Sequence, residues 1–188
     1  MLGLWITLGV VGFLAIVTII YIVGTRNSLV RMRNNVEESF SAMDISMKKR
    51  YDLVPNLVNT IKGATKHENQ TLVDVINARN ACVSATTKEE KSKAEAELSH
   101  TLKNLFALTE SYPDLKANAN FLDLQAKLES LELEIANSRR FYNANVKEMN
   151  NKVEMFPSNI IAKWFKFEKE KMFELDSPEE RKNVKVEF

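Results

Sequence analysis

The chain opens with an uncharged, apolar run from Leu2 to Val23. A helix over these residues is roughly 33 Å long at about 1.5 Å of rise per residue, enough to cross a hydrocarbon core about 30 Å thick. Trp5 and Tyr21 lie near its two ends, where amphipathic rings favour the membrane interface. The run therefore predicts a transmembrane anchor over residues 1–24. Its apolar part begins at Leu2 and ends at Val23, with Trp5 and Tyr21 as the aromatic residues at the two interfaces.

Two other interpretations of the run fit less well. A cleaved signal peptide has a basic start, an apolar stretch of about 7 to 15 residues and a small-x-small cleavage site, and the run lacks all three. A buried core helix this long and this apolar would need a much larger core around it. We therefore expect a retained, single-pass helix that contacts the lipid bilayer. A homo-oligomer formed through this helix stays an open alternative.

Positive charge follows the run on one side only. Arg26, Arg31 and Arg33 lie just after it, and no Lys or Arg precedes it. Cytoplasmic flanks of membrane spans carry an excess of Lys and Arg. The three arginines therefore predict a cell-membrane protein with its N-terminus outside and its C-terminal domain in the cytoplasm.

Beyond the anchor, apolar positions recur every three or four residues, which is the period of a helix with one buried face. Four such stretches cover 25–62, 72–85, 87–112 and 118–155. The first and last would each be about 57 Å long and can pair antiparallel. The pattern predicts an all-α fold: an N-terminal transmembrane helix followed by an antiparallel, mainly up-and-down four-helix bundle with long first and last helices. Its domain is residues 25–175, and residues 176–188 form a polar tail.

Local signals place the ends of these helices. Pro55 predicts a kink or a restart within the first stretch, and whether that helix turns at Pro55 or at Gly63 stays open. Thr87 and Glu90 have the spacing of a capping box that starts the third helix, and Pro113 should stop it. The stripe of the second helix is Leu72, Val75, Ile76, Arg79 and Val83.

An aromatic and basic segment follows the last long helix. Antiparallel pairing brings this helix back toward the membrane that the first one leaves. Trp164, Phe165 and Phe167 then alternate with lysines over residues 156–173. The segment either closes the base of the bundle, which the cost of exposed aromatics favours, or lies among anionic headgroups, with these three rings as interface contacts.

Composition narrows the function. The chain has 26 Lys and Arg and 25 Asp and Glu, a net charge of +1. Proteins that bind nucleic acid cluster positive charge on their surface, so this balance argues against nucleic acid as a partner. The single cysteine, Cys82, is expected to be a free, partly buried thiol. The run from Lys48 to Arg50 is expected to be a solvated helix face.

A search for catalytic or metal-binding patterns finds fragments only. His67 and Glu68 lack the second histidine of a zinc HExxH pattern. Glu97 and His100 have the Glu-x-x-His spacing that di-iron bundles use twice, and the second copy is missing. We expect no enzyme activity, cofactor or metal. The alternative is a metal-dependent or catalytic membrane-associated regulator that uses His67, Glu68, Glu97 and His100.

Several groups of residues, in order along most of the chain, resemble the LemA family of bacterial single-span membrane proteins. They are Lys49 to Val58, Lys62-Gly63, His67-Glu68, Ala78-Arg79, Tyr112 to Ala117, Asn120-Phe121, Tyr142-Asn143 and Phe156 to Asn159. One departure is Lys166-Phe167-Glu168, where the family commonly has Gly-Phe-Lys. The resemblance implies an N-terminal span, an antiparallel helical domain on the cytoplasmic side and no established enzymatic activity. The sequence thus predicts a membrane-anchored interaction or scaffold protein with an unidentified protein partner.

Overall fold

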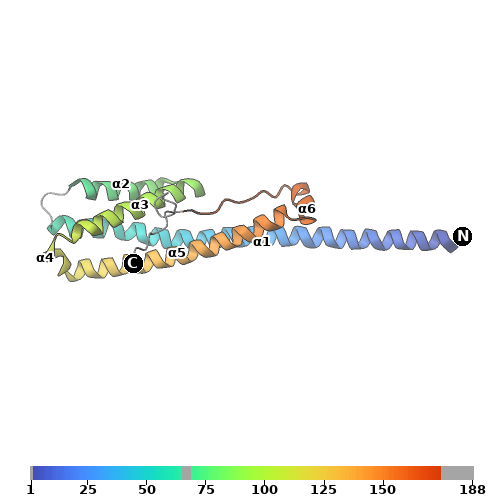
Figure 1. The fold of residues 1–188 in the computed structure, drawn as a ribbon, viewed down its shortest axis with the longest axis horizontal. Helices are drawn as coiled ribbons and strands as arrows, with labels where there is room; N and C mark the ends of the chain where they lie inside the picture. The colour runs from blue at the N-terminus through green and yellow to red at the C-terminus, as the bar shows by residue number, and fades with distance from the viewer. Residues whose placement is uncertain (1, 65–68, 175–188) are drawn as a thin grey trace, which may run out of the picture. The chain divides into compact units, whose positions relative to one another are not determined.

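The computed structural model describes residues 2–64 and 69–174 and is all-α over these ranges, as predicted (Figure 1). The residues cluster into two compact units. Unit 1 is Met1–Phe40 with Phe141–Met172, and unit 2 is Ser41–Arg140 with Phe173–Phe188. The helices are α1 (Leu2–Ala64), α2 (Asn69–Ser84), α3 (Lys88–Thr109), α4 (Pro113–Lys116), α5 (Ala119–Glu154) and α6 (Ser158–Trp164). The predicted polar tail over residues 176–188 lies outside the described residues.

The first helix is longer than predicted. α1 joins the anchor to the first bundle helix without a break and continues through Pro55 to Ala64. The restart considered at Pro55 was therefore wrong. Proline lacks the amide that would bond to the carbonyl four residues back, which is that of Tyr51. That carbonyl instead accepts a hydrogen bond from Nε of Arg79, at 3.2 Å. The alternative turn, at Gly63 to Lys66, extends into residues outside the described ones.

In unit 1, α1 and α5 pack antiparallel. The ring of Phe40 meets that of Tyr142 edge to face, with centroids 5.7 Å apart, and Asn145 Nδ2 donates to the carbonyl of Asn35 at 3.5 Å. From the first of these contacts to the second, the residue number falls on α1, from 40 to 35, and rises on α5, from 142 to 145. This is the pairing that antiparallel helices require. The buried side chains of these two helices in unit 1 include Leu29, Val36, Tyr142, Val146 and Met149.

The segment after α6 returns along α5 within unit 1. Tyr142 Oη donates to the carbonyl of Lys171 at 3.0 Å. Asn150 bonds to the main chain of Glu170 from both ends of its amide, at 2.8 and 2.9 Å. Ile161 and Ala162 of α6 are buried. This part of residues 156–173 therefore packs on the helical body, as the bundle-closure interpretation expected.

Unit 2 contains α2, α3 and α4 with the adjoining parts of α1 and α5. Figure 1 shows α2 and α3 side by side, and the two helices are in contact. Ser46 Oγ on α1 donates to Glu134 on α5 at 2.7 Å. The buried apolar side chains on α1, α3 and α5 include Met43, Met47, Val54, Leu57, Ile61, Leu98, Leu102, Leu105, Phe121, Leu128 and Ile135.

The helix ends in unit 2 confirm one prediction and correct another. Thr87 and Glu90 form the predicted capping box, with Glu90 N donating to Thr87 Oγ1 and Thr87 N donating to Glu90 Oε2, both at 3.1 Å. The main-chain amides of Thr86 and Thr87 lower the pKa of Glu90. By contrast, α3 ends at Thr109. Pro113 starts the short helix α4 instead, because its fixed φ suits the first helical position.

The stripe of α2 differs in phase from the predicted one. Val83 is exposed and Arg79 is half-buried. Ala78 and Cys82 take the buried positions instead, together with the predicted Leu72 and Val75. The steps of three and four residues were correct, but the choice between adjacent positions was wrong because sequence period alone fixes a face only to within one residue.

Candidate membrane interface and buried polar network

The N-terminal part of α1 is a candidate membrane span. It is long and apolar enough to cross a bilayer, and its most apolar window is 0% buried in the folded chain. Trp5, Tyr21 and Val23 are all exposed there, and α1 begins at Leu2. Such a surface is costly in water and favourable in hydrocarbon. The predicted anchor thus coincides with a segment of α1 whose apolar window is not covered by any other described part of the chain.

Two arginines that follow the span contact two aromatic rings. The guanidinium carbon of Arg26 lies 5.4 Å from the ring centroid of Phe165, and that of Arg33 lies 5.5 Å from the centroid of Phe167. Arg26 and Arg33 are two helical turns apart and so share a face of α1. Both pairs lie within the range of cation–π attraction. Arg26 and Arg33 were predicted as orientation signals, and Phe165 and Phe167 as membrane-interface contacts; the structure brings these residues together. The third arginine, Arg31, is exposed elsewhere on α1.

A left-handed residue at the end of α6 positions these rings. Lys166 has φ of 56°. Its amide donates to the carbonyl of Lys163 at 3.2 Å, and the amide of Phe167 donates to that of Ala162 at 2.9 Å. These are the two bonds of a Schellman cap, which usually uses glycine at the left-handed position. The cap turns the chain so that Phe165 and Phe167 both reach α1.

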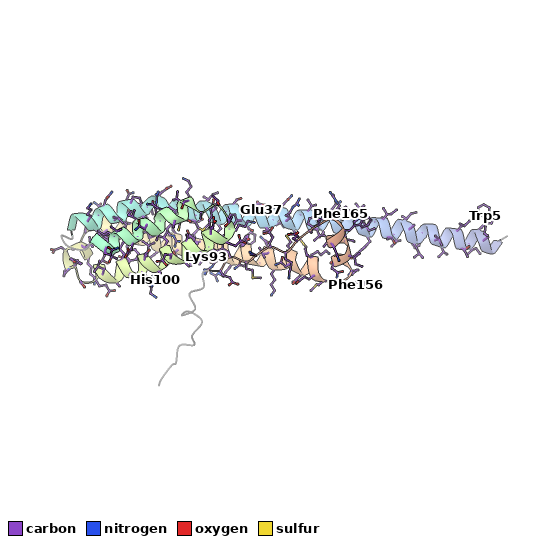
Figure 2. The ribbon with its side chains drawn as sticks, turned by 90° about the horizontal axis from the view of Figure 1, so that it is seen from above. Trp5, Glu37, Lys93, His100, Phe156 and Phe165 are labelled. Carbon is purple, nitrogen blue, oxygen red and sulfur yellow. The ribbon has the colours of Figure 1, made fainter. Side chains whose placement is uncertain are left out.

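Exposed apolar side chains gather around α6. We call them the end patch: Met155, Phe156, Ile160, Trp164 and Phe165. Phe156 is 79% and Trp164 68% exposed. The rings of Trp164 and Phe165 adjoin, with centroids 5.6 Å apart. Figure 2 shows Phe156 and Phe165 in the part of unit 1 where the uncovered segment of α1 begins. The aromatic segment is thus only partly used to close the body.

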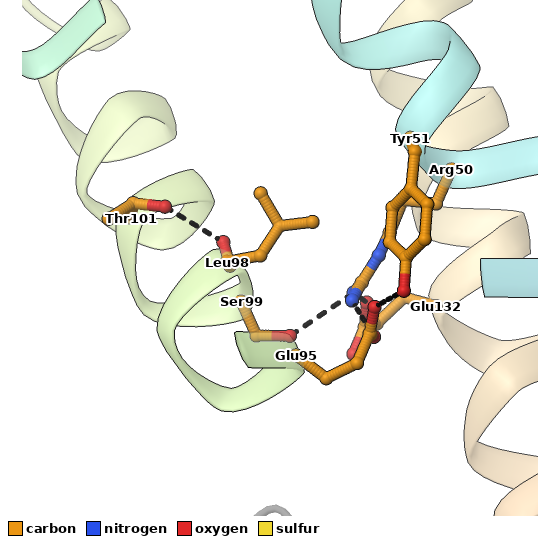
Figure 3. A network of polar contacts seen from close by, with 7 residues as sticks. All are labelled: Arg50, Tyr51, Glu95, Leu98, Ser99, Thr101 and Glu132. Atoms are coloured by element: carbon orange, nitrogen blue, oxygen red, sulfur yellow. Dashed lines mark hydrogen bonds and ion pairs between the residues drawn. The ribbon is translucent and has the colours of Figure 1, made fainter. Parts of the chain in front are cut away.

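Unit 2 contains a buried polar network that joins three helices (Figure 3). The guanidinium of Arg50 on α1 is ion-paired with Glu95 on α3 and with Glu132 on α5, and its Nη1 donates to Ser99 Oγ at 3.1 Å. Tyr51 Oη donates to Glu95. The side chains of Arg50 and Glu95 are 1% and 0% exposed, whereas that of Glu132 is 48% exposed, so the network joins α1 to α3 in the core and reaches α5 at the surface.

Burial sets the protonation of this network. Burial raises the pKa of Glu95, Glu132 raises it further, and Arg50 opposes both. Burial also raises the pKa of Tyr51, with Glu95 adding to the shift, so Tyr51 remains a hydroxyl donor. Burial and Glu95 raise the pKa of Cys82 to about 12. Cys82 is free and buried, and it is a neutral thiol at physiological pH rather than a nucleophilic thiolate.

The network corrects the solvated-face prediction for the basic run. Lys48 and Lys49 are exposed as expected, but Arg50 is buried. A signal was present in the sequence, because Arg50 lies three residues after Met47 and four before Val54, on the apolar stripe of its helix. Glu95 occupies the equivalent place on α3, three residues before Leu98. Opposite charges at core positions of two helices predict a buried pair.

The candidate metal residues do not form a described site. Glu97 and His100 are exposed on α3, where His100 Nδ1 lies 3.5 Å from Asn104 Nδ2, and Figure 2 shows His100 at the surface. His67 and Glu68 lie outside the described residues. Among residues 2–64 and 69–174, no group of three or more His, Cys, Asp or Glu side chains is arranged to hold a metal ion.

The fold and these sites define a helical protein with a candidate N-terminal membrane span. The model of the LemA family matches residues 39–188, and the chain belongs to this family. It is 28% identical to Protein LemA of Metamycoplasma hominis over 144 residues, which are 74% of this chain and 64% of the relative. The chain therefore covers less than two thirds of the length of that curated relative. The resemblance inferred from the sequence is confirmed.

Proposed function

We propose that this chain is a single-pass protein of the cell membrane whose cytoplasmic body, residues 25–175, is a non-catalytic interaction module. The observation that carries the proposal is the continuity of α1, which runs from the uncovered apolar segment into the buried core without a break. A helix is a stiff connection, whereas a Gly- or Ser-rich linker is flexible. The span therefore holds the adjoining part of the body, which belongs to unit 1, near the membrane surface. In the body, α1, α2, α3 and α5 make up the four-helix bundle.

The arginines support the orientation. Arg26, Arg31 and Arg33 follow the span directly, within the distance over which basic residues bias insertion. Their positive charge favours the cytoplasmic side for everything after Val23. Arg26 and Arg33 also stack on Phe165 and Phe167, so the same side chains serve both insertion and the fold.

The surface and the family match support an interaction role for the body. The family match begins at residue 39, after the candidate span, so the shared part is the body. Ile45 and Leu133 are 59% and 62% exposed and lie next to Ser46 and Glu134, which bond to each other at 2.7 Å. Large exposed aliphatic side chains are available for a protein partner to cover.

Affinity capture of the full-length chain from native membranes tests this function. We expect a protein to co-purify in constant ratio, and to be lost when Ile45 and Leu133 are both changed to Ser. Val73→Ser, on the exposed face of α2, is the matched control and should retain it. Capture of this chain alone, or equal recovery of the partner with the wild-type chain and with both variants, would contradict the proposed surface.

The metal-dependent alternative has its own test. Elemental analysis of the purified full-length protein would overturn the interaction proposal if it found stoichiometric zinc or iron that His67→Ala or His100→Ala removed. Lys103→Ala, on an exposed position of the same helix as His100, is the control that should leave any metal content unchanged.

A further inference from the structure

The contact between Arg26 and Phe165 fixes the height of the end patch relative to the span. Arg26 is three residues beyond Val23, so it lies about 4.5 Å further along the axis of α1. The headgroup region on each side of a bilayer is roughly 5 to 7 Å thick. With the span in the membrane, Arg26 is therefore at headgroup level. The ring of Phe165, 5.4 Å from its guanidinium, is at headgroup level as well.

The end patch has the composition of a membrane-interface surface. Trp164, Ile160 and Phe156 are each more than half exposed, and Ile161 and Ala162 face the body, so α6 has one inner face and one outer face. Lys163 and Lys166 are exposed within the same segment. Trp and Phe with adjacent lysines favour the boundary between acyl chains and anionic headgroups. The charge and the apolar character both match a leaflet that contains anionic lipid.

We propose that the end patch is a second membrane contact: α6 lies in the headgroup layer of the leaflet from which α1 emerges, with Trp164 and Ile160 toward the acyl chains and Lys163 and Lys166 at anionic headgroups. This inference rests on the span in the proposed function. A single span leaves the body free to rotate about the axis of α1. A second contact beside it removes that freedom for unit 1 and fixes which side of unit 1 faces the membrane.

The two tryptophans of the chain make the test direct. The full-length chain with Trp5→Phe retains Trp164 as the sole indole, and the chain with Trp164→Phe retains Trp5. Each is reconstituted into vesicles of a zwitterionic lipid, with or without an anionic lipid, that carry nitroxide-labelled lipids as shallow or deep quenchers. We expect Trp164 to emit at shorter wavelength than in water and to be quenched most by the shallow label, more strongly with anionic lipid.

Charge variants test the headgroup contact. Lys163→Gln with Lys166→Gln should reduce the quenching of Trp164 and remove its dependence on anionic lipid. Lys93→Gln with Lys103→Gln, at exposed positions of α3, is the matched control and should leave both unchanged. Equal effects of the two pairs would overturn the assignment of Lys163 and Lys166.

The remaining outcomes separate this inference from the proposed function. Trp164 with water-like emission and no quenching, while Trp5 is quenched by the deep or shallow label, overturns the second contact and leaves the span. Blue-shifted Trp164 emission without lipid quenching shows that protein covers the patch instead of lipid, which also overturns the lipid assignment. Trp5 that no lipid label quenches overturns the span, and the second contact with it.

Discussion

Arg79 Nε donates to the main-chain oxygen of Tyr51 at 3.2 Å, and this carbonyl is the one that Pro55 deprives of its helical donor. A side chain on α2 thus replaces a missing main-chain bond in α1. The exchange explains how a proline persists inside a long helix within the core of unit 2. It also means that the contribution of Arg79 to stability depends on whether residue 55 is a proline.

A double-mutant cycle tests that dependence. Arg79→Ala should lower the free energy of unfolding by about 1 to 3 kcal/mol, because a buried carbonyl loses its donor. In a Pro55→Ala chain, the amide of residue 55 can bond to the carbonyl of Tyr51. Arg79→Ala should then lower the free energy of unfolding by less than it does in the wild-type chain, with a difference of about 1 kcal/mol or more. Denaturant titration in detergent micelles gives the values. Arg140→Ala, at an exposed position, is the control. Equal losses for Arg79→Ala in the wild-type and Pro55→Ala backgrounds would show that Arg79 does not replace the main-chain donor that Pro55 lacks.

The Arg50 network predicts a large and specific loss of stability. Arg50→Met leaves Glu95 buried without its cation, and breaking a buried pair in this way costs roughly 3 to 5 kcal/mol. Adding Glu95→Leu removes the lone carboxylate and should restore part of the loss. Lys49→Met is the matched neighbour, since the ion pair of Lys49 with Glu134 is more than half exposed on the lysine side and should change stability by less than about 1 kcal/mol. Similar losses for Arg50→Met and Lys49→Met would contradict the network.

The raised pKa of Glu95 predicts a pH dependence with a definite sign. A carboxyl with a folded-state pKa above its unfolded value contributes stability that is complete below the unfolded pKa and is lost as the pH rises through the folded pKa. Glu95→Gln does not titrate. The stability of the wild-type chain relative to this variant should therefore fall as the pH rises from about 4 toward neutral. A relative stability that rises over this window would mean that attraction by Arg50 exceeds the cost of burial.

The left-handed residue after α6 predicts a stabilising substitution. Lys166→Gly relieves the steric cost that an L-residue incurs at φ of 56° and should stabilise unit 1 by about 0.5 to 1 kcal/mol. Lys163→Gly, inside α6, removes a lysine of the same segment but should destabilise by about 1 kcal/mol. Thermal melting of the full-length chain in micelles compares them. Shifts of the same sign for the two substitutions would contradict the cap.

Local patterns predicted much of this fold. The apolar run, the long α5 and the capping box at Thr87 depend on neighbouring residues, and each was found as expected. The place of Arg50 on the apolar stripe indicated its burial, but the stripe alone does not name its partners. The pairing of Arg50 with Glu132 and the bond from Arg79 to Tyr51 depend on which helices meet, and residues far apart in sequence give no such information. The meeting of Arg26 with Phe165 was missed for the same reason, although each residue had been singled out.

Labelling with a membrane-impermeant maleimide tests most directly whether α1 spans the membrane and leaves the body in the cytoplasm. In a Cys82→Ala background, Asn104→Cys places a thiol on the exposed surface of α3. We predict no labelling of this variant in intact cells and full labelling after permeabilisation, while Leu2→Cys in the same background is labelled in intact cells. Labelling of Asn104→Cys in intact cells would contradict the orientation, and release of the chain from membranes by alkaline extraction would contradict the span.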